Sequence, residues 1–200
     1  MSFFLVFIIA GLLVGFLTRG SLRRLAELSL HHWWLLLLGI LLRFPLMFSE
    51  SFSRATVGWV GAGLQIGGLV AILAFSLLNR HLRGILLVSL GNLLTLVAIV
   101  ANGGYMPGSE EMYLALLKWH GMTAQAEAFE AGLMNYHTTA LTAQTRLWVL
   151  TDIIPIPRIT AFPFVISIGD VLIAIGMFLI IVWGMHSPVV LQEEASTPPR

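Results

Sequence analysis

One acidic residue stands inside the last apolar run of the chain and is the strongest candidate for chemistry. Asp170 lies about eight residues after the start of the run at Phe162, which is roughly 12 Å along a helix that rises 1.5 Å per residue. An ionised carboxylate in apolar surroundings costs several kcal/mol unless it is paired, hydrated or protonated. Asp170 is therefore predicted either to bind a cation or to form a structural ion pair.

The expected partners of Asp170 are polar residues of the neighbouring runs, because polar groups in lipid prefer to face one another. The predicted cluster in the outer half of the bundle consists of Asp170, Arg43, Arg146, Asn92, Gln65, Asn102 and Asp152. The two arginines are alternative counter-ions for the carboxylate, and the last two residues would form a roof over the cluster. Thr95 lies one helical turn outward from Asn92.

The sequence contains no motif for a metal site, a nucleotide-binding loop or a catalytic nucleophile. It contains no cysteine, which excludes disulfides, thiolate metal sites and cysteine catalysis. The HExxH, P-loop and G-x-S-x-G patterns are missing from the sequence. We therefore predict no metal ion and no cofactor.

The composition is typical of a protein that is solvated by lipid. Hydrophobic residues make up 58% of the 200 residues and charged residues 10%, against roughly 25% charged in a soluble domain. Five apolar runs approach the roughly 17–25 residues that a helix needs to cross a bilayer. We predict an all-α, polytopic membrane helix bundle, a single domain over residues 1–186, with transmembrane helices at about 3–18, 33–48, 57–78, 85–101 and 162–184.

Glycines are concentrated in the first and third runs, where they let helix backbones approach closely. Gly11 and Gly15 form one small-xxx-small pair, and Gly63 and Gly67 form another. The third run is therefore expected to be central, although a flexible gate is an alternative role for its glycines. The predicted packing glycines are Gly11, Gly15, Gly58, Gly61, Gly63, Gly67 and Gly68.

The arginines set the predicted orientation. Arg19, Arg23 and Arg24 lie in the first connection, and Arg80 and Arg83 lie in the third. The positive-inside rule places both connections in the cytoplasm, with the N-terminus outside and the C-terminus inside a bacterial cytoplasmic (inner) membrane. The expected partners are the lipid bilayer and partner membrane subunits or a homo-oligomer. Nucleic acid is excluded, because a net charge of +1 provides no basic face.

A long segment, residues 102–161, is predicted to lie on the outer side. Ser109 is expected to cap a helix that runs through about Trp119, and a second helix is expected over 123–134; both are amphipathic. The run at 147–156 is too short to span and is interpreted as re-entrant or interfacial. The polar tail, 187–200, is predicted to be disordered.

Four motifs in fixed order carry a resemblance to a known family. They are Asn102-Gly-Gly-x-Met-Pro107, Thr145-Arg146-Leu, Asp152-Ile-Ile-Pro155 and Ile168-Gly169-Asp170. Over nearly its whole length the chain resembles a family of small bacterial multi-spanning membrane proteins of unknown function. The resemblance implies that the motifs gather on the outer side, and it implies no activity.

Three classes of function follow from these features. A non-enzymatic accessory or scaffold component explains the glycine pairs and the structured outer segment. A small-molecule or cation binding or transport protein would use a polar pocket around Asp170. An enzyme that uses Asp170, Asp152 or a histidine as acid or base is supported by the presence of those groups alone.

Overall fold

The long helices follow the apolar runs of the sequence. The structure is a computed structural model, and it describes residues 3–48, 58–131, 139–156 and 164–187. The predicted all-α class is confirmed, because helices dominate the described residues and each strand has two residues. The five long helices are α1 (Phe3–Leu17), α3 (Trp33–Phe48), α5 (Trp59–Leu78), α6 (Ile85–Ala101) and α9 (Ile168–Gly184).

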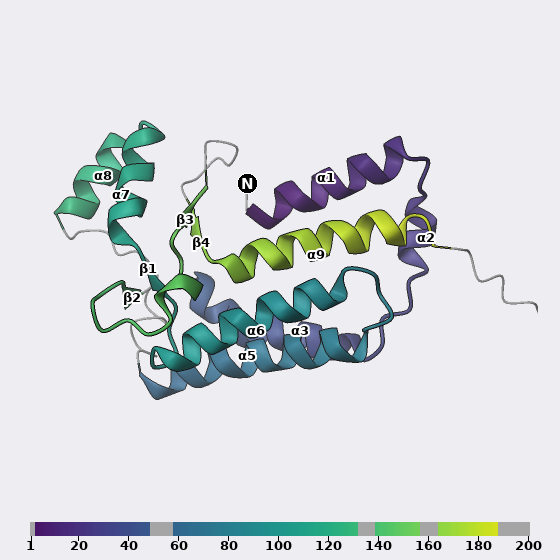
Figure 1. The fold of residues 1–200 in the computed structure, drawn as a ribbon, viewed down its shortest axis with the longest axis horizontal. Coiled ribbons are helices and arrows are strands. Elements are labelled where there is room, and N and C mark those ends of the chain that lie inside the picture. The colour runs from purple at the N-terminus through teal and green to yellow at the C-terminus, as the bar shows by residue number, and fades with distance from the viewer. Residues whose placement is uncertain (1–2, 49–57, 132–138, 157–163, 188–200) are drawn as a thin grey trace, which may run out of the picture.

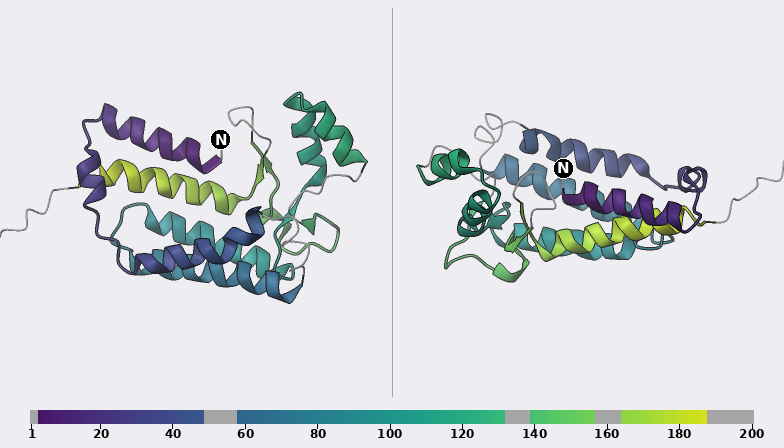
Figure 2. Two further views of the ribbon diagram at one scale, coloured as in Figure 1. Left: turned by 180° about the vertical axis from the view of Figure 1, so that it is seen from behind. Right: turned by 90° about the horizontal axis from the view of Figure 1, so that it is seen from above.

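These five helices stand side by side in an order that differs from the order of the chain (Figures 1 and 2). α1 packs on α9, α9 on α6, α6 on α5, and α5 on α3. α9 runs antiparallel to α6 but parallel to α1. The last helix of the chain is therefore inserted between the first helix and the three in the middle of the sequence.

One end of the bundle, which we call the basic end, is formed by α2 (Leu22–Ala26), the turn at 79–84 and the C-terminal turn of α9. Ser21 caps α2 by accepting a hydrogen bond from the Arg23 backbone N–H at 3.2 Å. The turn at 79–84 ends on Gly84, whose φ of +101° is a conformation that a residue with a Cβ rarely adopts. The two connections are also joined to each other, because the Asn79 side chain bonds the His31 backbone.

The other end, which we call the strand end, carries the two short helices and all four strands (Figure 1). Its elements are α7 (Glu110–Trp119), α8 (Thr123–Glu130), β1 (Pro107–Gly108), β2 (Thr139–Ala140), η1 (Trp148–Leu150), β3 (Ile154–Pro155) and β4 (Val165–Ile166). β1 and β2 pair in parallel, and β3 and β4 pair antiparallel. These strands were not predicted.

One predicted boundary at this end is wrong, one lies outside the described residues, and one prediction is confirmed. The last long helix begins at Ile168 rather than Phe162, because Val165 and Ile166 are extended and pair with β3. The second short helix ends at Glu130, and its predicted end at Met134 lies outside the described residues. The Ser109 hydroxyl accepts a hydrogen bond from the Met112 N–H, as predicted for the cap of α7.

The lengths of the helices bear on the membrane prediction. Within the described residues, α5 is the one helix that is both long and apolar enough to cross a membrane by length and composition. α1 has 15 residues, and α6 and α9 have 17 each, and all three are apolar. Of the predicted tail, 187–200, residues 188–200 lie outside the described residues.

Candidate functional site

The first part of the candidate site is Arg43, on the face of α3 that packs against α5. A Cβ built at Gly68 of α5 would lie 2.6 Å from the Arg43 Cγ and 2.9 Å from the Gly39 carbonyl oxygen. A side chain at position 68 would therefore displace the arginine. The Arg43 Nε is buried and has no hydrogen-bond partner among the described residues. Asp170 is the nearby opposite charge, although the two side chains form no ion pair among the described residues.

Asp170 is the third residue of α9, so it lies at the strand end of the bundle rather than deep within a helix. Its Oδ2 accepts hydrogen bonds from the Ser167 N–H at 3.0 Å and the Ser167 hydroxyl at 2.8 Å. The Ser167 Oγ in turn accepts from the Asp170 N–H at 3.2 Å. This is a capping box, in which two residues satisfy each other's free backbone donors. The depth predicted for Asp170 is wrong because the helix begins six residues later than expected.

Asp152 supplies a second carboxyl group close to the first. Its backbone is fixed against the segment around β1, donating to the Pro107 carbonyl at 3.0 Å and accepting from the Ser109 N–H at 3.1 Å. Its Oδ1 is buried and has no hydrogen-bond partner among the described residues. Burial, and then the negative charge of Asp170, raise the pKa of Asp152 to about 8. Arg43, Asp152 and Asp170 therefore form one electrostatic group, which we call the charged cluster.

Two hydroxyl groups lie close to Gly169, the residue before Asp170. Thr95 is 6% exposed, and its Oγ1 has no hydrogen-bond partner among the described residues. A Cβ built at Gly169 would collide with this hydroxyl and would lie 3.4 Å from the Ser167 Oγ. Thr95 of α6 and Ser167 at the start of α9 thus approach the same glycine. Ser167 was missed in the sequence, although Ser-x-x-Asp before an apolar run is a capping signature.

Asn92 and Gln65 were predicted to extend the charged cluster, but each has a different position. Asn92 is buried at the α5–α6 interface, where its Nδ2 donates to the Leu69 carbonyl at 2.8 Å. It therefore joins two helices by satisfying a backbone acceptor. Gln65 is partly buried on α5, and it makes no hydrogen bond to Asp152 or Asp170 in the described part of the chain.

Asn102 and Arg146 are paired with each other, which also differs from the prediction. The Asn102 Nδ2 donates to the Arg146 carbonyl at 2.9 Å, and its Oδ1 accepts from the Arg146 N–H at 2.9 Å. Arg146 is exposed and lies in no ion pair among the described residues. Of the two arginines that were alternatives, Arg43 is the one with a long-range electrostatic effect from Asp170, and neither forms an ion pair with it among the described residues.

Glycines allow α9, which carries Asp170, to approach α6 closely. On the α6–α9 interface, a Cβ at Gly91 would strike the Gly169 carbonyl, and one at Gly176 would lie 2.8 Å from the Gly84 carbonyl. Gly91 thus faces Gly169, and Gly84 faces Gly176, across the antiparallel crossing. In both segments the two glycines are seven positions apart in the chain. This interface was not predicted as a whole.

The predicted packing glycines have different surroundings. Gly11 and Gly15 both face α9, since a Cβ at Gly11 would lie 3.2 Å from the Ile181 Cβ and one at Gly15 would strike Met185. Gly61 and Gly68 are buried. Among the described residues, however, no atom comes within 4 Å of a Cβ built at Gly58 or Gly63, and at Gly67 the nearest is the Leu42 Cδ1 at 3.7 Å. The pair at 63 and 67 is thus not part of a close helix crossing in the described structure.

The fold and this site define an all-helical bundle protein with a charged cluster at one end. A family model described as "Family of unknown function (DUF5317)" matches residues 27–182, and the chain belongs to this family. The matched region contains all three members of the charged cluster. An uncharacterized protein of Thermotoga maritima is 31% identical over 113 residues, which cover 56% of this chain and 59% of that protein. No solved structure matches the chain.

Proposed function

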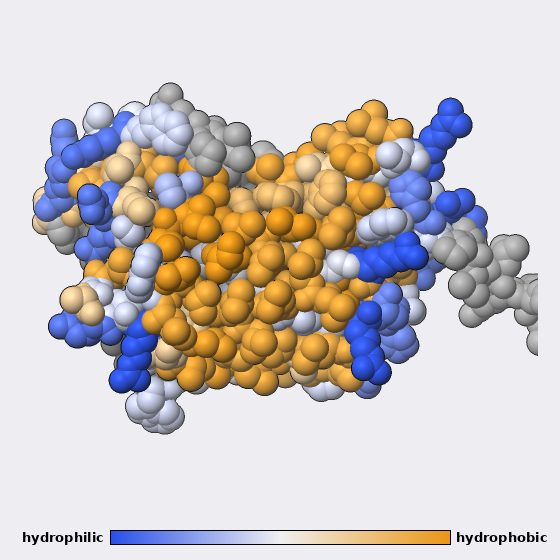
Figure 3. Space-filling model, viewed as in Figure 1, coloured by the Kyte–Doolittle hydropathy of each residue, from blue (hydrophilic) through white to orange (hydrophobic). Residues whose placement is uncertain are grey.

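We propose that this chain is a polytopic integral membrane protein whose role is that of a non-enzymatic accessory or scaffold component. The observation that carries the proposal is the apolar surface of the long helices. Leu17, Leu41 and Trp59 are 83%, 67% and 88% exposed, and they belong to three different helices or their ends. Figure 3 shows hydrophobic residues across the middle of the molecule and hydrophilic residues at both ends. A continuous apolar band of this kind needs lipid or protein to cover it.

The distribution of charge supports the same proposal. Across the five long helices the charged residues are Arg43 and Asp170, which carry opposite charges. Charged residues in membrane helices are rare and face the bundle interior, paired with one another. Helices of 17 residues reach the lower limit for crossing a bilayer. The interior is closely packed through glycine, which is typical of helix contacts in lipid.

Membrane extraction and cysteine labelling test the placement. The chain should remain in the membrane pellet after alkaline carbonate washing, which releases peripheral proteins. The chain has no cysteine of its own, so Arg80→Cys and Lys118→Cys provide single labels at opposite ends. A membrane-impermeant maleimide should label Lys118→Cys in intact cells, and Arg80→Cys after lysis alone. Release by carbonate, or labelling of both in intact cells, would overturn the proposed placement.

The accessory role has its own test. Solubilised native membranes, separated by native electrophoresis, should show this chain in a particle larger than a single chain in its detergent micelle. Migration as a single chain from native membranes would contradict a scaffold role while leaving the membrane placement intact.

A second candidate function, the binding of a monovalent cation or proton, is supported by the charged cluster. Thr95 Oγ1 and Asp152 Oδ1 are buried oxygens without hydrogen-bond partners among the described residues. Such groups cost about 1–3 kcal/mol each when left unsatisfied. With both carboxyls ionised, the cluster has two negative charges and one positive, so one further cation or proton neutralises it.

Thermal unfolding of the detergent-solubilised protein tests this second function. At pH 9, where Asp152 is ionised, sodium chloride should raise the unfolding temperature more than choline chloride at equal ionic strength. The difference should disappear in Asp152→Asn, which removes the charge but keeps the shape. Equal shifts in the two salts for the wild-type protein would exclude a sodium site.

A further inference from the structure

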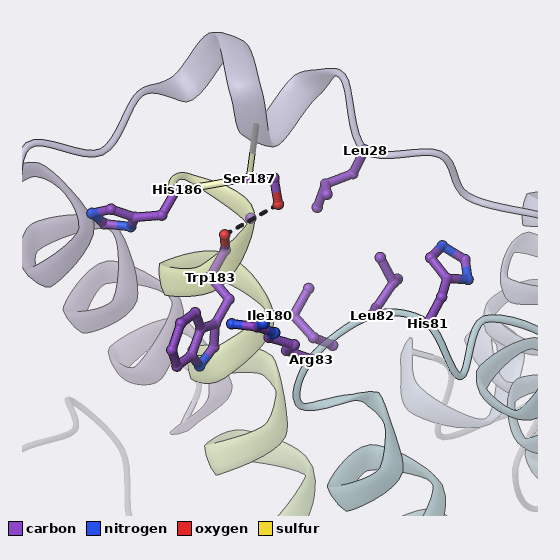
Figure 4. Close-up of a pocket in the computed structure, with 9 residues that line it drawn as sticks. Leu28, His81, Leu82, Arg83, Ile180, Trp183, His186 and Ser187 are labelled. Atoms are coloured by element: carbon purple, nitrogen blue, oxygen red, sulfur yellow. Dashed lines mark hydrogen bonds between the residues drawn. The ribbon is translucent and has the colours of Figure 1, made fainter. Parts of the chain in front are cut away.

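A cavity at the basic end lies far from the charged cluster and is not used by the proposals above. Its volume is about 260 Å³, and it lies between the last turn of α9 and the turn at 79–84. Leu28, Leu82 and Ile180 line its apolar part, and Figure 4 shows their side chains converging from three different segments. Arg83 and Trp183 lie together on one side of it. The cavity therefore joins an apolar floor to a cationic rim.

Arg83 is held in position without being neutralised. Its guanidinium carbon lies 4.5 Å from the centroid of the Trp183 ring, a cation–π contact. Among the described residues no carboxylate forms an ion pair with Arg83. Stacking covers one face of the guanidinium and leaves its N–H edge available, and this planar edge matches the oxygens of a phosphate.

His186 also lines the cavity, and it contributes positive charge rather than a free donor. Its ring nitrogens lie 2.7 Å from the Val182 carbonyl and 3.0 Å from the Thr18 carbonyl. Because a carbonyl accepts but never donates, both contacts are satisfied together when the imidazole carries both protons and a positive charge. The Ser187 hydroxyl donates to the Trp183 carbonyl at 3.2 Å, so Arg83 is the group that offers free donors to an anion.

The whole basic end carries an excess of positive charge. Its acidic residue in the described part of the chain is Glu27, which pairs with Arg23 at 2.9 Å. Its arginines are Arg19, Arg23, Arg24, Arg80 and Arg83. Anionic lipid surfaces attract such clusters, and basic pockets between membrane helices bind lipid head groups. Trp183, which is 46% exposed, is a residue type that concentrates at the level of the head groups.

We propose that this cavity binds the phosphate of an anionic phospholipid, with Arg83 contacting the phosphate and the glycerol lying over Leu28, Leu82 and Ile180. This inference rests on the proposed membrane placement. A volume of about 260 Å³ is below the roughly 300–1,000 Å³ of pockets for drug-sized ligands. It therefore accommodates a phosphate and its glycerol, while the acyl chains continue along the exposed apolar helices.

The test compares two arginines of the same turn. The full-length protein in a neutral maltoside detergent is titrated with phosphatidylglycerol or phosphatidylcholine, and thermal unfolding is followed by circular dichroism. Phosphatidylglycerol should stabilise the wild-type protein and the control Arg80→Gln, whose side chain is equally exposed but does not line the cavity. Arg83→Gln should need about tenfold more of this lipid for the same shift, since tenfold corresponds to one charge-assisted hydrogen bond.

Several outcomes would overturn the proposal. Equal titrations for Arg80→Gln and Arg83→Gln would show attraction to general positive charge rather than a site. Inorganic phosphate that protects as well as the lipid at equal concentration would assign the cavity to free phosphate. Native mass spectrometry of the wild-type protein, which does not depend on a folded variant, should retain phosphatidylglycerol in preference to phosphatidylcholine, and equal retention would contradict a lipid site. Failure of the proposed membrane placement would appear separately, as release by carbonate.

Discussion

Asn102 binds Arg146 through the arginine's main chain, and the guanidinium takes no part in the contact. The Asn102 side chain both donates to and accepts from the Arg146 backbone, and it also donates to the Ala98 carbonyl at 2.8 Å. Asn79 does the same at the opposite end, bonding the His31 N–H at 2.7 Å and the His31 carbonyl at 2.8 Å. Each asparagine ends a helix and fixes a distant segment against it, so α5 and α6 are tied to their loops in the same way.

This relationship predicts that Asn102→Asp destabilises the protein by about 2 kcal/mol, the cost of an unsatisfied buried polar group. The new oxygen would face the Ala98 and Arg146 carbonyls, which can only accept. Unfolding in mixed detergent, followed by circular dichroism, measures the change. Gln144→Glu, an amide-to-acid change at an exposed position of the same segment, is the control and should have little effect.

The capping box of α9 predicts two separable effects. Ser167→Ala should lower the free energy of unfolding by about 1 kcal/mol, the usual cost of losing an N-cap. Asp170→Asn keeps an acceptor for the Ser167 N–H but removes the charge that faces Arg43, so its cost should depend on Arg43. A double-mutant cycle with Arg43→Gln measures the coupling. Additive losses would show that the charges of Asp170 and Arg43 do not interact.

The pKa of Asp152 predicts how stability changes with pH. The pKa is raised to about 8 in the folded protein, so the folded state holds the proton more tightly than the unfolded state. The resulting stabilisation is complete below about pH 4, and it is lost as the pH rises through about 8. Stability should therefore fall by on the order of a few kcal/mol across that interval.

Asp152→Asn isolates this contribution, because every other titrating group is common to both proteins. The unfolding temperature of the variant should change less between pH 5 and pH 9 than that of the wild type. Parallel pH profiles would refute the raised pKa.

The glycines predict a contrast between two alanine substitutions. In Gly176→Ala the new Cβ would lie 2.8 Å from the Gly84 carbonyl and 2.9 Å from the Val88 N–H nitrogen, so backbone must move. Overpacking of this kind costs about 1–3 kcal/mol. Gly63→Ala meets no described atom within 4 Å and should be neutral or stabilising, because alanine favours the helix by about 1 kcal/mol. Equal losses of unfolding temperature for both variants would contradict the α6–α9 packing.

The helices were predictable from local sequence, but the short strand that precedes α9 was not. Continuous apolar residues identify a buried segment without distinguishing a short strand from a helix. Val165 and Ile166 are extended because they pair with Ile154 and Pro155, a contact that depends on the fold of the whole strand end. The Ser167–Asp170 capping signature was local, and it marks the true helix start.

The members of the charged cluster were only partly predictable, for a related reason. Asp152, Asp170 and Arg43 were named from their residue types, but the choice between Arg43 and Arg146 depends on which helices are neighbours. That order is set by packing at Gly68 and Gly169, and it does not follow the order of the chain. Gly84 and Gly91 share their spacing of seven with Gly169 and Gly176, and this repeat would have indicated the α6–α9 pair.

The position of α9 in the row has a consequence for biosynthesis. Among the described helices α1 leaves the ribosome first, yet α9, on which it packs, is the last of them to be made. α3, α5 and α6 can associate as they emerge, whereas α1 gains its partner only after residues 168–184 have been synthesised. A chain that stops before residue 168 would therefore leave α1 without the helix on which it packs.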